Sequence, residues 1–197
     1  MATTTSLLIL RHGPTRWNAD GRIQGSIDEP LSDAGRTRVA GWRLPDAAEA
    51  LRWIASPKRR AWETARLLGL DPVPEPRLVE MSWGEWEGRR TEDLLAAGLL
   101  PGRHDRLGLD FRPPGGESLR DVQARLRPWL AEVAATGRPA GAVAHSGVIR
   151  ALYALATGWD LRGAPTETLA DGCAHRFHLA ADGMPAVDRV NIPLAGG

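Results

Sequence analysis

Two histidines in the sequence each follow a short apolar run and stand beside residues suited to binding an anion. The run Leu7–Leu10 ends in Arg11 and His12, and the run Ala140–Ala144 ends in His145. Both runs are typical of buried strands in a parallel sheet. A cation or an imidazole costs free energy when it is buried without partners. Either each strand simply reaches the surface here, or its end is built to hold a negatively charged group.

A cluster of cations follows a third predicted strand, Leu51–Ala55. Ser56 and Pro57 are predicted to cap and open a helix whose first turn carries Lys58–Arg60. In open α/β sheets, ligands bind outside the carboxyl ends of the strands. Helix N-termini at that edge present free N–H groups and a positive dipole end. Two histidines, several arginines and two helix starts at one edge therefore predict a phosphate site.

The rest of the chain predicts strands that alternate with helices. Ser32 is expected to cap a helix that starts at Asp33, and Ser118 to cap a longer helix together with Asp121. A last strand is predicted over Arg176–Leu179. We expect an α/β fold, a three-layer sandwich in which helices flank a mostly parallel sheet.

The composition narrows the class of protein. The chain has 197 residues and a formal net charge of +1, which predict one domain over residues 1–197 and no general attraction to nucleic acid or membrane. Cys173 is the only cysteine, which excludes an intrachain disulfide. The N-terminal apolar run is too short for a signal peptide or a membrane span, so we expect a cytoplasmic location. A lid or loop insertion is predicted at about residues 88–116, because the part from Gly98 to Gly116 is rich in glycine and proline.

Motifs along nearly the whole chain resemble, in the expected order, those of the histidine phosphatase superfamily. That family contains cofactor-dependent phosphoglycerate mutases and many small phosphatases. Its opening motif resembles "RHGPTRWNADGRIQG", and its second motif resembles "SPKRRAWETA". The segment that bears its proton donor resembles "LVEMSWGEWEG", and its later motifs resemble "GGES" and "AVAHSGVIRAL". The resemblance implies a phosphoglycerate mutase-like fold and phosphoryl transfer through a phosphohistidine.

The same resemblance implies a role for each matching residue. His12 would be the nucleophile, with Arg11 and Arg60 as the guanidinium groups that bind the phosphoryl oxygens in a forked geometry. His145 would donate a hydrogen bond to those oxygens. Glu80 would protonate the leaving group and then activate water. Further phosphate contacts are expected from Thr15, Asn18, Gln24, Gly25 and Ser146.

Alternatives exist for two of these assignments. Arg59 stands beside Arg60 at the predicted helix start, and Glu85 and Glu87 lie close to Glu80 in the sequence. The position within the family motif favours Arg60 and Glu80. The nucleophile must be neutral to attack, and neighbouring arginines are expected to lower its pKa.

Three other polar residues have structural interpretations. Asn18 is as well suited to capping a loop as to binding phosphate. His175 and His178 form an HxxH pair, which we interpret as two strand residues because no matching ligands lie nearby. We therefore expect neither a metal nor a cofactor.

We expect a metal-independent phosphatase that hydrolyses small phosphate monoesters. The alternatives are a cofactor-dependent phosphoglycerate mutase and a non-catalytic module that binds a phosphorylated ligand. The expected partner is a small phosphorylated metabolite, with a homodimer as one possible assembly. Arg103, Arg106 and Arg112 in the predicted lid are expected to decide the substrate.

Overall fold

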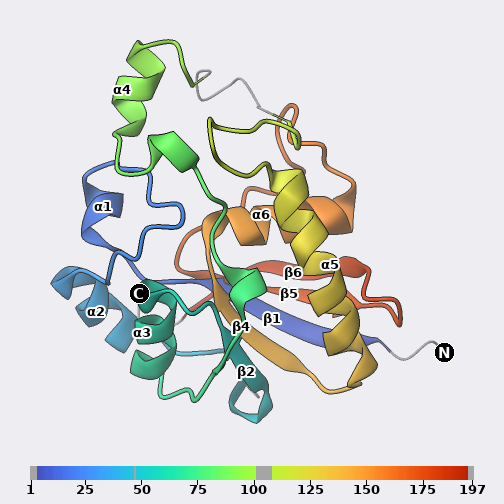
Figure 1. The fold of residues 1–197 in the computed structure, drawn as a ribbon. Helices are drawn as coiled ribbons and strands as arrows, with labels where there is room; N and C mark the ends of the chain where they lie inside the picture. Colours follow the sequence, from blue (N-terminus) through green and yellow to red (C-terminus); the bar gives the residue numbers. More distant parts are fainter. Residues whose placement is uncertain (1–3, 47, 101–107, 195–197) are drawn as a thin grey trace.

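The fold is a six-stranded mixed sheet with helices on both faces (Figure 1). The computed structural model describes residues 4–46, 48–100 and 108–194. The strand order is β3-β2-β4-β1-β5-β6. The strands are β1 (Thr5–Arg11), β2 (Arg52–Ala55), β3 (Val73–Pro74), β4 (Ala140–Ala144), β5 (Cys173–Leu179) and β6 (Pro185–Pro193).

Six α-helices and three short 3₁₀ helices connect the described strands. The α-helices are α1 (Arg16–Ala19), α2 (Asp33–Ala40), α3 (Arg59–Leu67), α4 (Thr91–Ala96), α5 (Leu119–Ala135) and α6 (Ser146–Thr157). The 3₁₀ helices are η1 (Ala48–Ala50), η2 (Pro76–Leu78) and η3 (Gly84–Trp86).

Two apolar clusters fix the three layers. On one face of the sheet, Leu7 and Ile9 of β1 pack in the cluster that contains the buried faces of α5 and α6. On the other face, Leu8 and Leu10 pack in the cluster that contains the buried residues of α2 and α3. Successive side chains of a strand point to opposite faces, so this alternation gives both helix layers a share of β1. The predicted three-layer α/β sandwich is confirmed.

The parallel register brings the carboxyl ends of three strands together. In the pairing of β1 with β4, Arg11 lies opposite Ala144. In the pairing of β2 with β4, Ala55 lies opposite Val143. The residues that follow these strands therefore meet at one edge of the sheet, as expected for a ligand site in an open α/β fold.

The sheet is mostly parallel, as predicted, and has antiparallel strands at one edge. β1, β2, β3 and β4 pair in parallel, but β5 pairs antiparallel with β1, and β6 antiparallel with β5. The predicted strand over Arg176–Leu179 begins earlier, at Cys173, and the strand β6 was not predicted. β6 begins and ends in proline and lies at the sheet edge, where proline is tolerated, so its sequence lacks a clear strand pattern.

The predicted start of the helix that follows β2 was wrong by two residues. α3 begins at Arg59 with Lys58 as its N-cap residue, so Pro57 lies outside the helix. Ser56 does not cap α3 in the usual way: its hydroxyl accepts from Lys58 N at 3.3 Å. This leaves the Ser56 side chain at the sheet edge, where it contacts His145.

Part of the predicted lid lies outside the described residues. Arg103 and Arg106 are in that part. Of the rest, α4 is a short helix, and Arg112 forms an ion pair with Asp121 at 2.6 Å. Among the described residues, no helix is long and apolar enough to cross a membrane.

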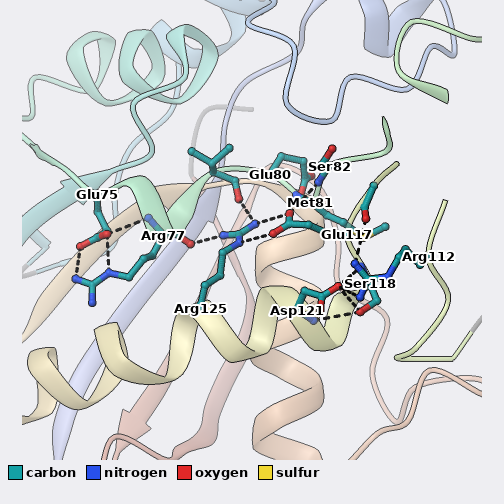
Figure 2. Close-up of polar contacts among 12 residues, drawn as sticks. Glu75, Arg77, Glu80, Met81, Ser82, Arg112, Glu117, Ser118, Asp121 and Arg125 are labelled. Atoms are coloured by element: carbon teal, nitrogen blue, oxygen red, sulfur yellow. Dashed lines mark hydrogen bonds and ion pairs between the residues drawn. The ribbon is translucent and has the colours of Figure 1, made fainter. Parts of the chain in front are cut away.

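The start of α5 has the predicted capping box (Figure 2). Ser118 Oγ accepts from Asp121 N at 3.2 Å, and the Asp121 carboxylate accepts from Ser118 N at 2.7 Å.

We expect Ser118→Ala to lower the free energy of unfolding by about 1 kcal/mol, because an orphan N–H of the first turn loses its acceptor. Urea denaturation would measure the change. Thr37→Ala, which removes an exposed hydroxyl inside α2, is the control, and an equal loss in both variants would contradict the capping role.

Candidate active site

The two predicted histidines meet at the carboxyl edge of the sheet. His12 N donates to Ala144 O at 3.0 Å, which extends the pairing of β1 and β4 by one residue. The ring centroids of His12 and His145 are 5.1 Å apart, with the rings at 61°. Both side chains are buried, with exposed fractions of 6% and 0%. Two residues separated by more than 130 positions in the chain are thus placed together by strand register.

The hydrogen bonds of His12 leave one ring nitrogen suited to attack. His12 Nδ1 lies 2.7 Å from Gly13 O. A carbonyl oxygen only accepts, so Nδ1 must carry the proton, and in the neutral ring Nε2 then holds the lone pair. The backbone beside His12 is itself fixed, because Gly13 N donates to Thr64 Oγ1 at 2.9 Å.

His145 has the opposite tautomer. Arg60 Nε donates to His145 Nδ1 at 3.3 Å, so Nδ1 holds the lone pair. The Nε2–H group then donates to Ser56 Oγ at 2.8 Å. The predicted donor nitrogen of His145 is therefore present, and in this structure its acceptor is Ser56.

Both histidines are neutral at neutral pH. Burial holds the pKa of His12 well below its ordinary value, and the charges of Arg11 and Arg60 lower it further, against the opposing effect of Gly13 O. Burial likewise holds the pKa of His145 well below its ordinary value, followed by the effects of His12 and Arg60. The expectation that neighbouring arginines keep the imidazole of His12 neutral agrees with these shifts, although burial is the larger cause.

Arg60 is completely buried and connects the histidines to the loop after α1. Its two terminal nitrogens donate to Ile27 O at 2.7 Å and to Gly25 O at 2.8 Å. Burial lowers the pKa of Arg60, and the nearby Glu80 carboxylate acts in the opposite direction. A guanidinium has five N–H donors, so the terminal nitrogens each keep one N–H beyond these bonds.

A carboxylate holds the loop that carries Gly25. Glu87 Oε1 accepts from Ser26 N at 2.7 Å and from Trp83 N at 3.0 Å. Gly25 has a φ of +52°, and a Cβ there would come within 2.1 Å of Glu87 Oε1, so only glycine fits. Glu87, an alternative to Glu80 in the sequence, instead bridges the segments of Ser26 and Trp83.

Arg11 is one half of an ion pair. Its terminal nitrogen lies 2.6 Å from Asp171 Oδ1, and the Arg11 side chain is 24% exposed. Both residues line a cavity of about 300 Å³ that includes His12 and Asn18. They also line a second cavity of about 380 Å³. No sequence signal indicated Asp171, because it lies 160 residues from Arg11 and reaches it through the pairing of β5 with β1.

The remaining predicted phosphate contacts differ in their surroundings. Thr15 and Asn18 form a capping box at the start of α1, which is the capping alternative for Asn18, although Asn18 also lines the smaller cavity. Gln24 is buried, and its Oε1 has no hydrogen-bond partner in the described part of the chain. Ser146 is the first residue of α6 and lines the larger cavity beside Arg11.

Glu80 reaches the site from the segment between η2 and η3. Its carboxylate accepts from Met81 N at 2.8 Å and from Gly147 N at 3.1 Å. A Cβ on Gly147 would lie 2.4 Å from Glu80 Oε1, so the carboxylate occupies the space that a side chain would fill. Trp83 and Trp86 stack on each other at 6.3 Å, and Trp86 contacts Phe111. Glu80, rather than Glu85 or Glu87, therefore lies against the first turn of α6, next to His145.

The HxxH pair has the structural contacts predicted for strand residues. His175 Nδ1 accepts from Asn191 N at 3.3 Å, and burial lowers the pKa of His175 to about 4. His178 contacts Asp188 at 3.5 Å. Within residues 4–46, 48–100 and 108–194, no cluster of three or more metal-ligating side chains is found.

Comparison with known proteins identifies the family of this chain. The sequence profile of the histidine phosphatase superfamily (branch 1) matches residues 7–193. The chain belongs to that superfamily. It is 36% identical over 201 residues to a glucosyl-3-phosphoglycerate phosphatase of Mycolicibacterium vanbaalenii, covering 91% of this chain and 87% of that one.

Two further relatives represent the two activities considered from the sequence. A solved structure of mycobacterial glucosyl-3-phosphoglycerate phosphatase in complex with VO3 has a TM-score of 0.75 and 31% identity, over 97% of this chain and 99% of that one. A 2,3-bisphosphoglycerate-dependent phosphoglycerate mutase of Azorhizobium caulinodans is 31% identical over 193 residues, covering 89% of this chain and 93% of that one. Of the two curated sequences, the phosphatase of Mycolicibacterium vanbaalenii, at 36% identity, is more similar to this chain than the mutase, at 31%.

Thr64 links Arg60 to the His12 loop, and sequence reasoning missed it. Its hydroxyl donates to Arg60 O at 2.7 Å while it accepts from Gly13 N, and the side chain is completely buried. The spacing of four residues from Arg60 on one helix was the available signal. We expect Thr64→Val to lower the free energy of unfolding by about 1–3 kcal/mol, because Gly13 N–H would stay buried without an acceptor. Chemical denaturation would measure this change.

Thr64→Ser is the matched control because it keeps the hydroxyl and removes only a methyl group. The serine variant should retain most of the turnover rate that the valine variant loses. Equal destabilisation and equal turnover in the two variants would contradict the hydrogen-bonding role.

Proposed function

We propose that this member of the superfamily is a phosphatase that hydrolyses small phosphate monoesters through a phosphohistidine at His12. The observation that carries the proposal is the convergence of a neutral imidazole, with its Nε2 lone pair free of the backbone, and the guanidinium groups of Arg11 and Arg60. Phosphoryl transfer depends mainly on positioning and on electrostatic stabilisation of the equatorial oxygens. The buried His12 and Arg60 and the partly exposed Arg11 support both requirements.

The proposed reaction has two steps. In the first, His12 Nε2 bonds to phosphorus, the bond from phosphorus to the leaving oxygen breaks, and Glu80 gives that oxygen its proton. In the second, water bonds to phosphorus and gives a proton to Glu80, the N–P bond breaks, and inorganic phosphate leaves. The Nε2–H group of His145 donates to Ser56 Oγ in this structure. A phosphoryl oxygen that accepts from this N–H must share it with the Ser56 hydroxyl or displace that hydroxyl.

The larger cavity suits the part of the substrate that does not react. It adjoins the site because Arg11 and Ser146 line it, and its wall includes Arg150 and Trp159. A cation and an aromatic ring suit a polar, sugar-like leaving group, and the phosphatase relatives are named for a glucosyl phosphoglycerate. We infer a small phosphorylated metabolite of that class as the substrate, with the predicted lid at about residues 88–116 contributing to its selection. The cytoplasmic location and the homodimer stay predictions from the sequence.

Replacing the nucleophile tests the proposal directly. We expect wild type to release inorganic phosphate and to acquire one phosphoryl group on His12, detected by intact-mass spectrometry of the quenched enzyme. His12→Ala should lower kcat by about 10⁴-fold or more, because the covalent route is lost. His178→Ala, at a half-buried histidine of β5 that contacts Asp188, should retain full activity. Phosphorylation of wild type followed by transfer to a second hydroxyl, without phosphate release, would favour the mutase instead.

The pKa of His12 predicts the acid side of the pH profile. A nucleophile with a lowered pKa stays neutral as the pH falls below about 6.5 and is protonated only when the pH passes its lower, folded-state value. Arg11→Met removes a positive charge that lowers this pKa, so the titration of His12 should move to higher pH. Nuclear magnetic resonance of the imidazole groups, assigned with a His12→Gln variant, would measure the pKa of His12 in the wild type and in Arg11→Met. A midpoint for His12 that is unshifted in the wild type would contradict the burial argument.

A further inference from the structure

Glu80 stands on a segment without strand pairing. It lies between η2, which ends at Leu78, and η3, which begins at Gly84. Its own hydrogen bonds fix the carboxylate to Met81 N and Gly147 N, but neither bond fixes the backbone before Glu80. The position of this carboxylate therefore depends on what holds the segment from outside.

Arg125 of α5 holds the segment before Glu80 (Figure 2). One terminal nitrogen donates to Val79 O at 2.6 Å, and the other donates to Arg77 O. Val79 immediately precedes Glu80 in the chain. The forked guanidinium thus binds two carbonyl groups on the N-terminal side of the proposed proton donor.

Glu117 holds the segment after Glu80. Its carboxylate accepts from Ser82 N at 3.0 Å, and its own N–H donates to Ser82 O at 2.8 Å. The same carboxylate pairs with Arg125 Nε at 3.1 Å, so the two side chains act together. Their exposed fractions are 21% for Arg125 and 29% for Glu117. The backbone is thus bound on both sides of Glu80 by two residues whose side chains form an ion pair with each other.

We propose that the Arg125–Glu117 pair is a positioning device for proton donation by Glu80. This role rests on the proton transfer proposed above, and it concerns residues that touch the backbone around Glu80 rather than the substrate. A general acid must lie within hydrogen-bond reach of the leaving oxygen, and small displacements of catalytic groups are costly to the rate. Arg125 lies in α5 and Glu117 lies just before its N-cap residue, so the helix layer on one face of the sheet positions a group at the sheet edge.

Arg77 offers a matched control in the same place. Its guanidinium pairs with Glu75 at 2.8 Å and with Glu132 of α5 at 2.6 Å. It therefore also joins this segment to α5, but its guanidinium bonds to Glu75 rather than to the backbone beside Glu80 (Figure 2). Arg77→Met removes ion pairs of the same kind while the backbone carbonyl that Arg125 uses is retained.

The test is the dependence of kcat/KM on the leaving group. The substrates are a series of phosphate monoesters from 2,4-dinitrophenyl through phenyl to an alkyl phosphate. This parameter covers the steps up to departure of the leaving group and excludes hydrolysis of the phosphohistidine. A dinitrophenolate leaves without a proton, whereas an alkoxide needs one, so a misplaced acid affects only the poorer leaving groups.

We expect Arg125→Met to lower kcat/KM for the alkyl phosphate by about 10- to 100-fold and for the dinitrophenyl ester by less than about threefold. Glu117→Gln should change the same dependence in the same direction to a smaller extent. Arg77→Met should keep the wild-type dependence. The two substitutions around Glu80 change the local charge in opposite senses, so a shared direction indicates lost positioning rather than an altered field.

Three outcomes would overturn this role. In the first, Arg125→Met keeps the wild-type dependence of kcat/KM on the leaving group. In the second, Arg125→Met lowers kcat/KM equally for all leaving groups. In the third, Arg125→Met and Glu117→Gln change this dependence in opposite directions. Glu80→Gln serves as the reference, with the steepest dependence expected. A wild-type dependence in Glu80→Gln would refute the proton transfer itself, whereas a steep one with an unchanged Arg125→Met would refute only the positioning role.

Discussion

The buried guanidinium of Arg60 is the interaction on which the site depends. A cation without access to water must have its hydrogen bonds satisfied by the protein, since its desolvation is otherwise costly. Arg60 uses three of its five N–H groups in this way, in bonds to His145, Gly25 O and Ile27 O. The end of β4, the start of α3 and the loop after α1 therefore cannot move independently. This constraint, more than any single contact to a ligand, gives the site its shape.

The same burial makes the histidines chemically useful. An imidazole in a dry and positively charged environment stays neutral, because protonation would add a further unsolvated cation. His12 then keeps a lone pair on Nε2, and His145 keeps a proton on its own Nε2. Two identical side chains thus have opposite tautomers, and the difference arises from which backbone or guanidinium atom each one faces.

The proposed acid, Glu80, comes from a different part of the fold. Glu80 lies against the first turn of α6, where Gly147 leaves room for it. Arg125 of α5 binds the backbone before Glu80, and Glu117, which precedes α5, binds the backbone after it. The sheet fixes the proposed nucleophile, and the helix layer fixes the proposed acid. The two proposed roles thus fall to separate parts of the fold.

The sequence by itself determined the alternation of strands and helices, the capping of α2 and α5, and the positions of His12, Arg60 and His145 at element ends. These features depend on local periodicity and on capping residues, which act over a few positions. The tertiary structure alone decided the antiparallel edge β5–β6, the pairing of Arg11 with Asp171, and the roles of Thr64 and Glu87. Such contacts depend on strand register and on the satisfaction of buried polar groups, and both are properties of segments that meet only after the chain has folded.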